Sequence, residues 1–508
     1  MIWMVMLGGI MRQSHLLKQS TIRVGAMIIV KLFGLIGRVI LTRLVGAEGI
    51  GLYQMAYSFY GFLVMLSGGL PTALAIITAK KSILGRHFLK ISSLYIVLSG
   101  SIISLAVFWN STQIAEFLGN SQLEYGLRSL APAILAAPLL GLLRGYLQGL
   151  EKFSIIAASE VFEQGCRIFC MLLLVYHLMP MGIDRAVGGG MYATFVGAFI
   201  SFAMLALFIS LDKKKLVHSP YESSTLPFVW FLRISVMISF TRLLIPVSEF
   251  IDSILIPSRL ISAGYTSSEA ISMFGIISGM AAVIAYTPTL VTGALSHTTT
   301  IRLAAHWQKG NHNEFHHLSR LSFKIGWLWG LTSGTFMFVY AKEFSLFIFN
   351  IEDAYLSIKY MSLIPLIVGF REMSTSILWS QDVKKIPFWG LCVGICSSII
   401  VQYFLIGIHG LGYIGAAIGI LSMEIIASAW NGRALNIGKG EFIRMLPSII
   451  LDTVAICGTM SLIYLFVNSF QDTLLDITRF LMSGCLFGLM SGLYIYLRCV
   501  AFPKIHKN

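Results

Sequence analysis

The chain has 508 residues, of which 56% are hydrophobic and only 12% are charged, and its mean hydropathy is +0.80. Soluble domains carry about 25% charged residues, so this composition excludes a soluble protein and indicates an integral membrane protein. The net charge of +14 does not indicate nucleic-acid binding, because the cations lie in short clusters between apolar runs and form no basic domain.

The first ten residues, MIWMVMLGGI, are too short to span a membrane. They also lack the basic start and the cleavage site of a secretory signal peptide. We therefore expect either a short extension or a translation start at Met11.

A membrane-spanning helix needs about 20 predominantly apolar residues. Fourteen segments meet this requirement, and no hydrophilic stretch between them is long enough for a soluble domain. Whatever the protein does, it does inside the bilayer. In chain order, the expected spans are residues 22–45, 51–79, 88–109, 124–147, 154–177, 186–211, 228–256, 270–296, 322–341, 356–379, 387–408, 412–434, 445–468 and 476–499.

Loop charge predicts the orientation of these spans. The two termini and every second loop between them hold 23 of the 37 lysines and arginines, whereas the opposite loops clearly hold only Arg185, Arg259 and Lys342. Because positively charged loops stay in the cytoplasm, this alternation predicts fourteen spans with both termini cytoplasmic. We expect a multi-pass protein of the cytoplasmic membrane.

The first span is unusual because it carries Lys31, Arg38 and Arg43. An ionisable group at bilayer depth costs roughly 2.5–3.5 kcal/mol on insertion scales, so it usually faces protein or water and marks a pathway. Lys31 and Arg38 share a helix face, while Arg43 lies nearer the helix end and can extend to the lipid headgroups. We predict that Arg38 lines a hydrated cavity for an anionic group; the alternative is that all three cations are interfacial.

Two halves of the chain share a weak pattern. The second span ends in GGLPTAL (68–74) and the eighth contains YTPTLVTGAL (286–295), each with a Pro-Thr pair near its cytoplasmic end. This spacing corresponds to a repeat of six spans, and interrupted helices at equivalent positions of two repeats often mark the substrate site of a secondary transporter.

The fourth and fifth spans carry further charges. Glu163 and Arg167 are separated by four residues in the favourable order, so an ion pair within one helix is the first expectation and a cavity role is the alternative. Arg128 and Arg144 bracket the fourth span near its opposite ends. Each is either an interfacial anchor or a ligand for substrate.

The seventh span carries Arg242, Glu249 and Asp252, with Pro246 near its middle. Arg242 and Glu249 share a face but lie two helical turns apart, about 10 Å, which is too far for a direct pair. We predict a cavity role for Arg242. Pro246 removes a backbone hydrogen bond, so the helix should be kinked or divided.

Later spans contain single charges at Arg371, Glu372, Glu424 and Asp452. The acids are candidates for coupling to protons or sodium, but hydrogen bonds between helices are the simpler expectation. We expect no metal site, because the seven cysteines lack zinc-site spacing and the histidine-rich loop HWQKGNHNEFHH is polar and cytoplasmic. No catalytic motif occurs in a suitable setting.

Several motifs, taken together, resemble the stage V sporulation protein B family of polysaccharide-biosynthesis-type transporters. That family belongs to the multidrug/oligosaccharidyl-lipid/polysaccharide flippase superfamily, which includes the lipid II flippases. The resemblance covers nearly the whole chain from about Met11. The motifs that carry it are RVILTRLVGAEGIGLYQMAY (38–57), GGLPTAL (68–74), LRGYLQG (143–149), SEVFEQGCR (159–167) and FGIISG (274–279).

The resemblance implies an all-α, MATE-like fold with two six-helix lobes around a central cavity and two further helices at the carboxyl end. In related lipid II flippases those two helices form a groove for the lipid tail. We accordingly divide the chain into a cytoplasmic segment (1–21), an N-lobe (22–211), a C-lobe (212–434) and the last two spans with the cytoplasmic carboxyl terminus (435–508).

The resemblance also implies a function: alternating access would move a polyprenyl-pyrophosphate-linked saccharide, such as a peptidoglycan or polysaccharide precursor, to the outer leaflet. Spore cortex synthesis is one candidate process. Arg38 matches a cavity arginine of those flippases, and Arg43 is a companion. The acidic partner common in their second span is absent here, where residues 51–54 read GLYQ, and the proline that often follows RGYxQG is missing from EKFSIIAAS.

The predicted cavity residues are Arg38, Arg43, Arg128, Glu163, Arg167, Arg242, Glu249 and Asp252. We expect no cofactor, with transport coupled to the membrane potential or an ion gradient. The expected partners are the bilayer, the lipid-linked substrate and cell-envelope synthesis enzymes, with no nucleic acid, and we expect a monomer.

Three other functions stay open. A multidrug or metabolite antiporter could couple through Glu249 or Asp252, although Arg38 and Arg242 disfavour cationic drugs. A membrane-embedded glycosyltransferase or polymerase should carry a sizeable outer loop with catalytic residues, and no loop qualifies. A scaffold for envelope assembly would not need the charges within the membrane.

Overall fold

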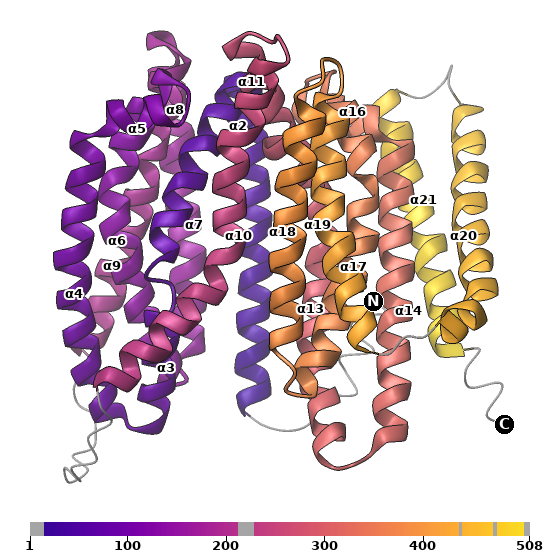
Figure 1. Ribbon diagram of the computed structural model, residues 1–508, viewed down its shortest axis with the longest axis horizontal. Coiled ribbons are helices and arrows are strands. Elements are labelled where there is room, and N and C mark those ends of the chain that lie inside the picture. Colours follow the sequence, from indigo (N-terminus) through magenta and orange to yellow (C-terminus); the bar gives the residue numbers. More distant parts are fainter. Residues whose placement is uncertain (1–14, 212–227, 436–438, 471–474, 502–508) are drawn as a thin grey trace. The chain divides into compact units, whose positions relative to one another are not determined.

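The computed structural model describes residues 15–211, 228–435, 439–470 and 475–501 (Figure 1). These ranges are almost entirely helical and contain no strand, which confirms the expected all-α fold. The chain forms two compact units, one ending at Ile254 and the other beginning at Leu255, so that helix α10 contributes to both. We describe each unit by itself.

The first unit is drawn from indigo to magenta in Figure 1. Its core is formed where α6 packs against α3, α4 and α9, and it is filled by buried aliphatic and aromatic side chains such as Leu74, Leu140, Tyr146 and Phe231. Its elements are α2 (His15–Met65), α3 (Leu70–Lys80), α4 (Ser82–Trp109), α5 (Ser111–Phe117), a 3₁₀ turn (Ser121–Leu123), α6 (Glu124–Gly149), α7 (Phe153–Leu178), a 3₁₀ turn (Met179–Met181), α8 (Ile183–Met191), α9 (Ala193–Leu211) and the first part of α10 (Phe228–Ser262).

Helix α2 holds the first expected span and most of the second, joined at Gly46; α3 holds the rest of the second. Gly46 has φ +68° and ψ −170°, a conformation that glycine adopts readily and other residues avoid. The expected spans 22–45 and 51–79 meet at this kink. The second half of α2 ends at Met65, and α3 begins after a short turn with Pro71 in its first turn, where proline's missing N–H would have had no partner anyway.

The second unit is built around α17, which packs against α13, α14 and α19. Close approach at α14 depends on small residues: a side chain at Gly330 would collide with the backbone of Pro365 and Leu366. Its elements are the rest of α10, α11 (Ser267–Phe274), a π segment (Gly275–Ala281), α12 (Ala282–Tyr286), α13 (Thr289–Gln308), α14 (His312–Val339), α15 (Ala341–Glu343), a π segment (Phe344–Phe349), α16 (Ala354–Tyr360), a 3₁₀ turn (Met361–Leu363), α17 (Ile364–Ser380), α18 (Lys385–Ile406), α19 (Gly412–Ala434), α20 (Lys439–Asn468), α21 (Asp476–Tyr496) and a π segment (Leu497–Ala501).

Helices α20 and α21 form a separate layer on α14. Phe336 of α14 stacks with Phe480 and Phe487 of α21, and buried aliphatic residues of α20 complete this cluster. The two helices are also joined by a buried carboxylate, since Asp452 of α20 accepts hydrogen bonds from Tyr494 (2.7 Å) and from Arg498 Nε (2.8 Å). The expected role of Asp452 as a contact between helices is confirmed.

Helices lie at all fourteen positions where spans were expected, and eleven helices within the described ranges are long and apolar enough to cross a membrane. The three expected spans outside those eleven are the two halves of α2 and the segment in α14. The protein is a multi-pass membrane protein. The number of fourteen spans, the four-part division at residues 21, 211 and 434, and the orientation stay predictions.

Prolines mark interruptions at corresponding positions of the two units. Pro71 lies at the start of α3, after the break that follows α2, and Pro288 caps the start of α13, after α12. The two Pro-Thr pairs thus occupy the same kind of place, directly after a break in the second span of each unit. Pro246 does not divide α10, which runs without a break from Phe228 to Ser262 and is bent in Figure 1.

Candidate functional site

In the first unit, Arg38 lies close to the kink in α2. Its guanidinium donates a hydrogen bond to the side-chain oxygen of Gln54 and lies 5.8 Å from the ring centroid of Tyr53, both on the far side of Gly46. The kink therefore allows an arginine in the first half of α2 to contact polar and aromatic groups in the second half. Arg38 thus contacts a neutral amide and the face of an aromatic ring, and the carboxylate of Glu249 adds an electrostatic interaction.

Arg167 of α7 is the second cation of this region. It donates a hydrogen bond to Gln164 on its own helix, and its Nη1 lies 3.5 Å from the hydroxyl of Tyr57. Tyr57 is itself fixed by a 2.6 Å hydrogen bond with Thr194 of α9. In the part of the chain that the structure describes, no carboxylate lies within 4.0 Å of Arg167.

The tyrosines of α2 connect the two arginines. Tyr53 and Tyr57 stack with ring centroids 4.7 Å apart, and Tyr60 meets Tyr57 edge to face at 5.4 Å. These three residues follow helical spacing and share one face of the second half of α2. We call Arg38, Arg167 and the three tyrosines, together with Gln54 and Gln164, the arginine cluster.

Glycines bring α2 and α7 together at this cluster. A Cβ atom at Gly37 would lie 2.9 Å from the side chain of Ile168, and one at Gly34 would lie 3.1 Å from Nε2 of Gln164. On the other side of α7, a Cβ atom at Gly197 of α9 would lie 2.9 Å from the carbonyl oxygen of Glu163. Small residues on both neighbours thus let α7 place Gln164 and Arg167 against α2.

Glu163 does not pair with Arg167, so the expected ion pair within α7 is wrong. Its carboxylate instead lies 2.7 Å from Nη1 of Arg144 on α6, and both side chains are about 20% exposed (20% and 19%). Nε of Arg144 also donates to the hydroxyl of Ser159 at 3.0 Å. Helical spacing alone favoured Arg167, but the tertiary packing of α6 on α7 supplies a closer cation.

This contact also connects three of the motifs noted in the sequence. Arg144 belongs to LRGYLQG, and its two partners belong to SEVFEQGCR. The next residue, Gly145, lies so close to α3 that a side chain there would collide with the carbonyl oxygen of Pro71, which belongs to GGLPTAL. The glycines of LRGYLQG thus serve close helix packing, and its arginine makes a buried ion pair.

Of the other predicted cavity residues, Glu249 interacts electrostatically with Arg38. Arg128 is 43% exposed, pairs with Glu124 one turn earlier at 2.7 Å and donates to Ser111 at 2.8 Å, an arrangement suited to an anchor at a helix end. Arg43 has an exposed side chain. On α10, Glu249 is exposed and Asp252 is half-buried.

Arg242 of α10 contacts the break between α2 and α3. Its Nη1 donates to the carbonyl oxygen of Gly68, in the turn between the two helices, at 3.1 Å. The hydroxyl of Ser239 accepts a hydrogen bond from the N–H of Gly69 at 2.8 Å. The break in the second span is therefore held by α10, with Arg242 accessible on its surface.

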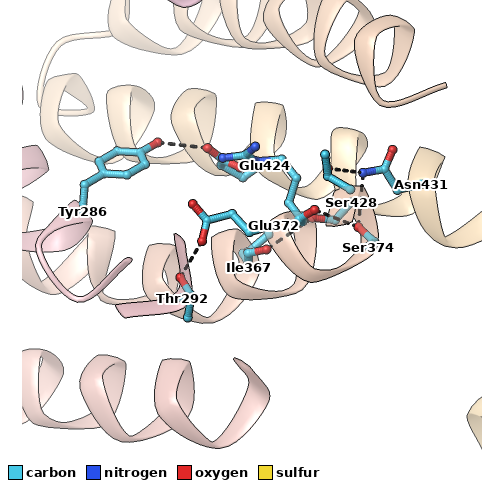
Figure 2. A network of polar contacts seen from close by, with 10 residues as sticks. Tyr286, Thr292, Ile367, Glu372, Ser374, Glu424, Ser428 and Asn431 are labelled. Atoms are coloured by element: carbon cyan, nitrogen blue, oxygen red, sulfur yellow. Dashed lines mark hydrogen bonds and ion pairs between the residues drawn. The ribbon is translucent and has the colours of Figure 1, made fainter. Parts of the chain in front are cut away.

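The second unit contains a contrasting polar network, shown in Figure 2. Arg371 of α17 forms an ion pair with Glu424 of α19, whose side chain is 2% exposed. Tyr286 donates a hydrogen bond to the same carboxylate at 3.2 Å. Glu372 points to the opposite side, where Thr292 of α13 donates to it at 2.6 Å. We call these five residues the carboxylate cluster.

Hydroxyl and amide groups extend this network along α17. Asn431 of α19 donates to Ser374 at 3.2 Å and to Thr375 at 3.0 Å, and Ser428 donates to the carbonyl oxygen of Ile367 at 3.3 Å (Figure 2). These groups connect α17 to α19, while Glu372 connects it to α13. The expectation that the single charges of the later spans make contacts between helices is confirmed for Arg371, Glu372 and Glu424.

Several of these residues were missed by sequence reasoning. Tyr53, Tyr57 and Gln54 were not predicted to belong to the site, although the helical spacing of the tyrosines on one face was a readable signal. The roles of Gln164 and Thr194 were not readable, because their partners come from other helices. Among the described residues, no three histidine, cysteine or acidic side chains lie close enough together to hold a metal ion.

Comparison with known proteins identifies relatives of this chain. Residues 16–268 match the family model described as polysaccharide biosynthesis protein. The chain is 24% identical to stage V sporulation protein B of Bacillus subtilis over 465 residues, which is 89% of each chain. It is 26% identical to lipid II flippase MurJ of the same organism over 279 residues, which is 50% of this chain and 51% of that protein.

Solved structures show the same fold. An inward-facing multidrug resistance MATE family transporter of the MOP superfamily superposes with a TM-score of 0.67 at 15% identity, covering 82% of this chain and 98% of the other. A MOP superfamily transporter from Pyrococcus furiosus, described as having a binding pocket of reverse polarity, gives a TM-score of 0.58 at 16% identity over 83% and 95%. The relatives whose names state an activity are a flippase and transporters, not enzymes. By sequence, this chain is similar to the polysaccharide biosynthesis protein family over residues 16–268, and it has a MATE-like fold.

Proposed function

We propose that this protein is a flippase that moves a polyprenyl-pyrophosphate-linked saccharide from the cytoplasmic to the outer leaflet of the cytoplasmic membrane by alternating access. The observation that carries the proposal is the environment of Arg167. This cation lies in an apolar helix, and its hydrogen-bond partners are the neutral side chains of Gln164 and Tyr57. An intramembrane cation that is oriented by neutral groups, with no carboxylate of the described residues in direct contact, is a candidate binding site for an anion.

The chemistry of the substrate class fits this environment. A pyrophosphate group cannot cross hydrocarbon alone, because transferring its charge out of water is strongly unfavourable. Guanidinium groups offer bidentate, charge-assisted hydrogen bonds to phosphate oxygens. Arg38 and Arg167, joined through Tyr53 and Tyr57, would provide two such groups, while the prenyl tail stays in the lipid.

The relatives support the choice of substrate. MurJ of Bacillus subtilis is named as a lipid II flippase, and the full-length similarity is to a protein named for a stage of sporulation. We therefore favour a peptidoglycan or polysaccharide precursor as cargo, with spore cortex synthesis as the process. Cell-envelope synthesis enzymes would supply and consume this cargo.

Three further parts of the proposal concern the setting. The loop charges favour a cytoplasmic location for both termini. Movement of an anionic cargo would be coupled to the membrane potential or to an ion gradient, for which Glu249 and Asp252 are candidate groups. We propose that the protein works as a monomer and without a cofactor.

Depletion of the protein tests the cargo directly. We expect a lipid-linked saccharide precursor to accumulate on the inner leaflet, measured by extraction of polyprenyl-pyrophosphate lipids and by a leaflet-specific labelling reagent. Re-expression of the wild-type chain should clear the precursor, and Arg167→Gln should not. If no precursor accumulates and depleted cells instead retain cationic dyes, the antiporter alternative would replace this proposal.

A further inference from the structure

Glu163 stands between two arginines. Its carboxylate pairs with Arg144 of α6 at 2.7 Å, while Arg167 follows one turn later on its own helix. A glutamate four residues before an arginine is in the favourable order for an ion pair on a helix. Nevertheless Arg167 is bonded to Gln164 and Tyr57, and Glu163 is directed to α6.

We infer that Arg144 is a positioning residue: it holds Glu163 away from Arg167, so that Arg167 remains available for an anionic headgroup. This inference rests on the proposed function, because it assigns a role toward the same anion site. Arg144 itself would not bind the headgroup. Its contribution would be to keep a nearby carboxylate from neutralising the site.

The packing fixes Arg144 for this task. The hydroxyl of Ser159 donates to the carbonyl oxygen of Ile156 at 2.7 Å, which leaves its lone pairs for Nε of Arg144 at 3.0 Å. Directly after Arg144, Gly145 is pressed against the backbone of Pro71, so α6 cannot shift easily. The guanidinium is therefore anchored on one edge and presents Nη1 to Glu163.

Removing Arg144 should redirect Glu163. A carboxylate that is about one-fifth exposed is stabilised strongly by the nearest cation, since the local dielectric is low. Without Arg144 that cation is Arg167, and the new pair would compete with any anion for the same guanidinium. The loss of a positive residue on α6 would thus weaken anion binding on α7 through Glu163.

A set of variants tests this chain of effects. The probe is farnesyl pyrophosphate, titrated onto the purified full-length protein in nanodiscs. We expect Arg144→Gln to weaken binding by about tenfold. Adding Glu163→Gln should restore the affinity to within about twofold of wild type, because no carboxylate then remains to compete. Glu163→Gln alone should bind the probe at least as tightly as wild type.

Two results would overturn the inference. If Arg144→Gln with Glu163→Gln binds as weakly as Arg144→Gln alone, then Arg144 contacts the ligand itself or only supports the fold. If Arg144→Gln binds like wild type, Glu163 does not move to Arg167. Failure of the proposed function looks different, because Arg167→Gln would then bind the probe as wild type does.

A second measurement does not depend on ligand. Thermal unfolding of the single and double variants at Glu163 and Arg167 gives the coupling between these residues. We expect little coupling when Arg144 is present and clear coupling in the Arg144→Gln background. Arg144→Lys keeps a cation at this position, so the coupling between Glu163 and Arg167 should stay as small as in wild type. This variant provides the comparison if Arg144→Gln folds poorly. The absence of new coupling in either experiment would refute the inference.

Discussion

Two half-buried arginines, Arg371 of the second unit and Arg167 of the first, lie in opposite environments. In the carboxylate cluster of the second unit, Arg371 pairs with Glu424, and a further acid, Glu372, lies beside it. In the arginine cluster of the first unit, Arg167 is hydrogen-bonded to the side chains of Gln164 and Tyr57. The carboxylate of Glu163, one turn earlier, pairs instead with Arg144 of α6. Arg371 therefore connects two helices, whereas Arg167 is an oriented hydrogen-bond donor that makes no direct ion pair.

This difference shows that a charge within the membrane is not by itself a sign of function. A buried ion pair with its hydrogen bonds satisfied connects helices and leaves little charge for a ligand. A cation whose partners are neutral keeps its field, and the surrounding groups only fix its direction. The arginine cluster is thus the part of the molecule where an anionic cargo has a reason to bind.

The largest expected effect comes from removing cations of the first unit. We expect Arg38→Ala, Arg167→Gln and Arg242→Ala each to abolish clearance of the lipid-linked precursor while the protein remains in the membrane. The first two remove donors to the headgroup, and the third removes the contact that holds the break after α2 at Gly68. Complementation of depleted cells measures this, with membrane immunoblotting for protein level.

Arg479→Gln is the matched control for these variants. Arg479 is an arginine near the start of α21 that already pairs with Asp476, so its loss should leave transport unchanged. Full complementation by Arg38→Ala and Arg242→Ala would contradict the assignment of these cations to the transport pathway.

The second effect is one of stability. Arg371→Met leaves the carboxylate of Glu424 buried without its cation, and we expect the free energy of unfolding to fall by about 3–5 kcal/mol. Changing Glu424 to Gln in the same chain should recover most of that loss, because the remaining group is neutral and can still accept from Tyr286. Thermal unfolding in detergent, monitored by a thiol-reactive dye, measures both. Equal thermal unfolding midpoints for wild type and Arg371→Met would contradict the assignment of a structural role to the carboxylate cluster.

The smallest effect is expected at an exposed pair outside the membrane. Lys384 lies 2.7 Å from Asp382 in the turn between α17 and α18, and this hydrogen bond and charge lower the pKa of the Asp382 carboxyl. A carboxyl whose pKa is lowered by folding stabilises the folded state at pH values above its unfolded-state pKa. That contribution is lost as the pH falls through the folded-state pKa. Because both groups are exposed, water and salt screen the pair.

Asp382→Asn should therefore leave the unfolding midpoint unchanged at neutral pH, and the wild-type and variant curves should coincide in acid as well as at pH 7. The same measurement on Arg371→Met should give an unfolding midpoint below that of wild type at every pH. A clear destabilisation by Asp382→Asn would mean that accessible and buried pairs contribute alike, against the comparison drawn above.

Much of the fold could be predicted from composition and periodicity. Runs of apolar residues located helices at all fourteen expected positions, although the short helix α5 was not expected. Arg38 was recognisable because a cation in such a run needs a reason to be there. The merging of two spans into α2 could not be foreseen, because it depends on the backbone conformation of a single glycine, Gly46. Proline indicated helix boundaries more clearly than glycine did, since Pro71 and Pro288 both lie at helix starts.

The site was less predictable than the fold. Spacing on one helix suggested that Glu163 pairs with Arg167, but the actual partner, Arg144, comes from the neighbouring helix α6. Contacts of this kind depend on which faces pack together, and one sequence does not contain that information. The charges at Arg371 and Glu424 were noticed one by one, and their pairing became visible only in the folded chain.

The most direct test of the central claim compares two ligands that differ only in charge. Farnesyl pyrophosphate and the neutral alcohol farnesol would be titrated onto the full-length protein in nanodiscs, with the wild type beside Arg167→Gln. We predict that the wild type binds the pyrophosphate at least about tenfold more tightly than the alcohol, and that Arg167→Gln largely removes this preference. Equal affinity of the wild type for both ligands, or an unchanged preference in Arg167→Gln, would contradict the claim that the arginine cluster receives a phosphate-bearing headgroup.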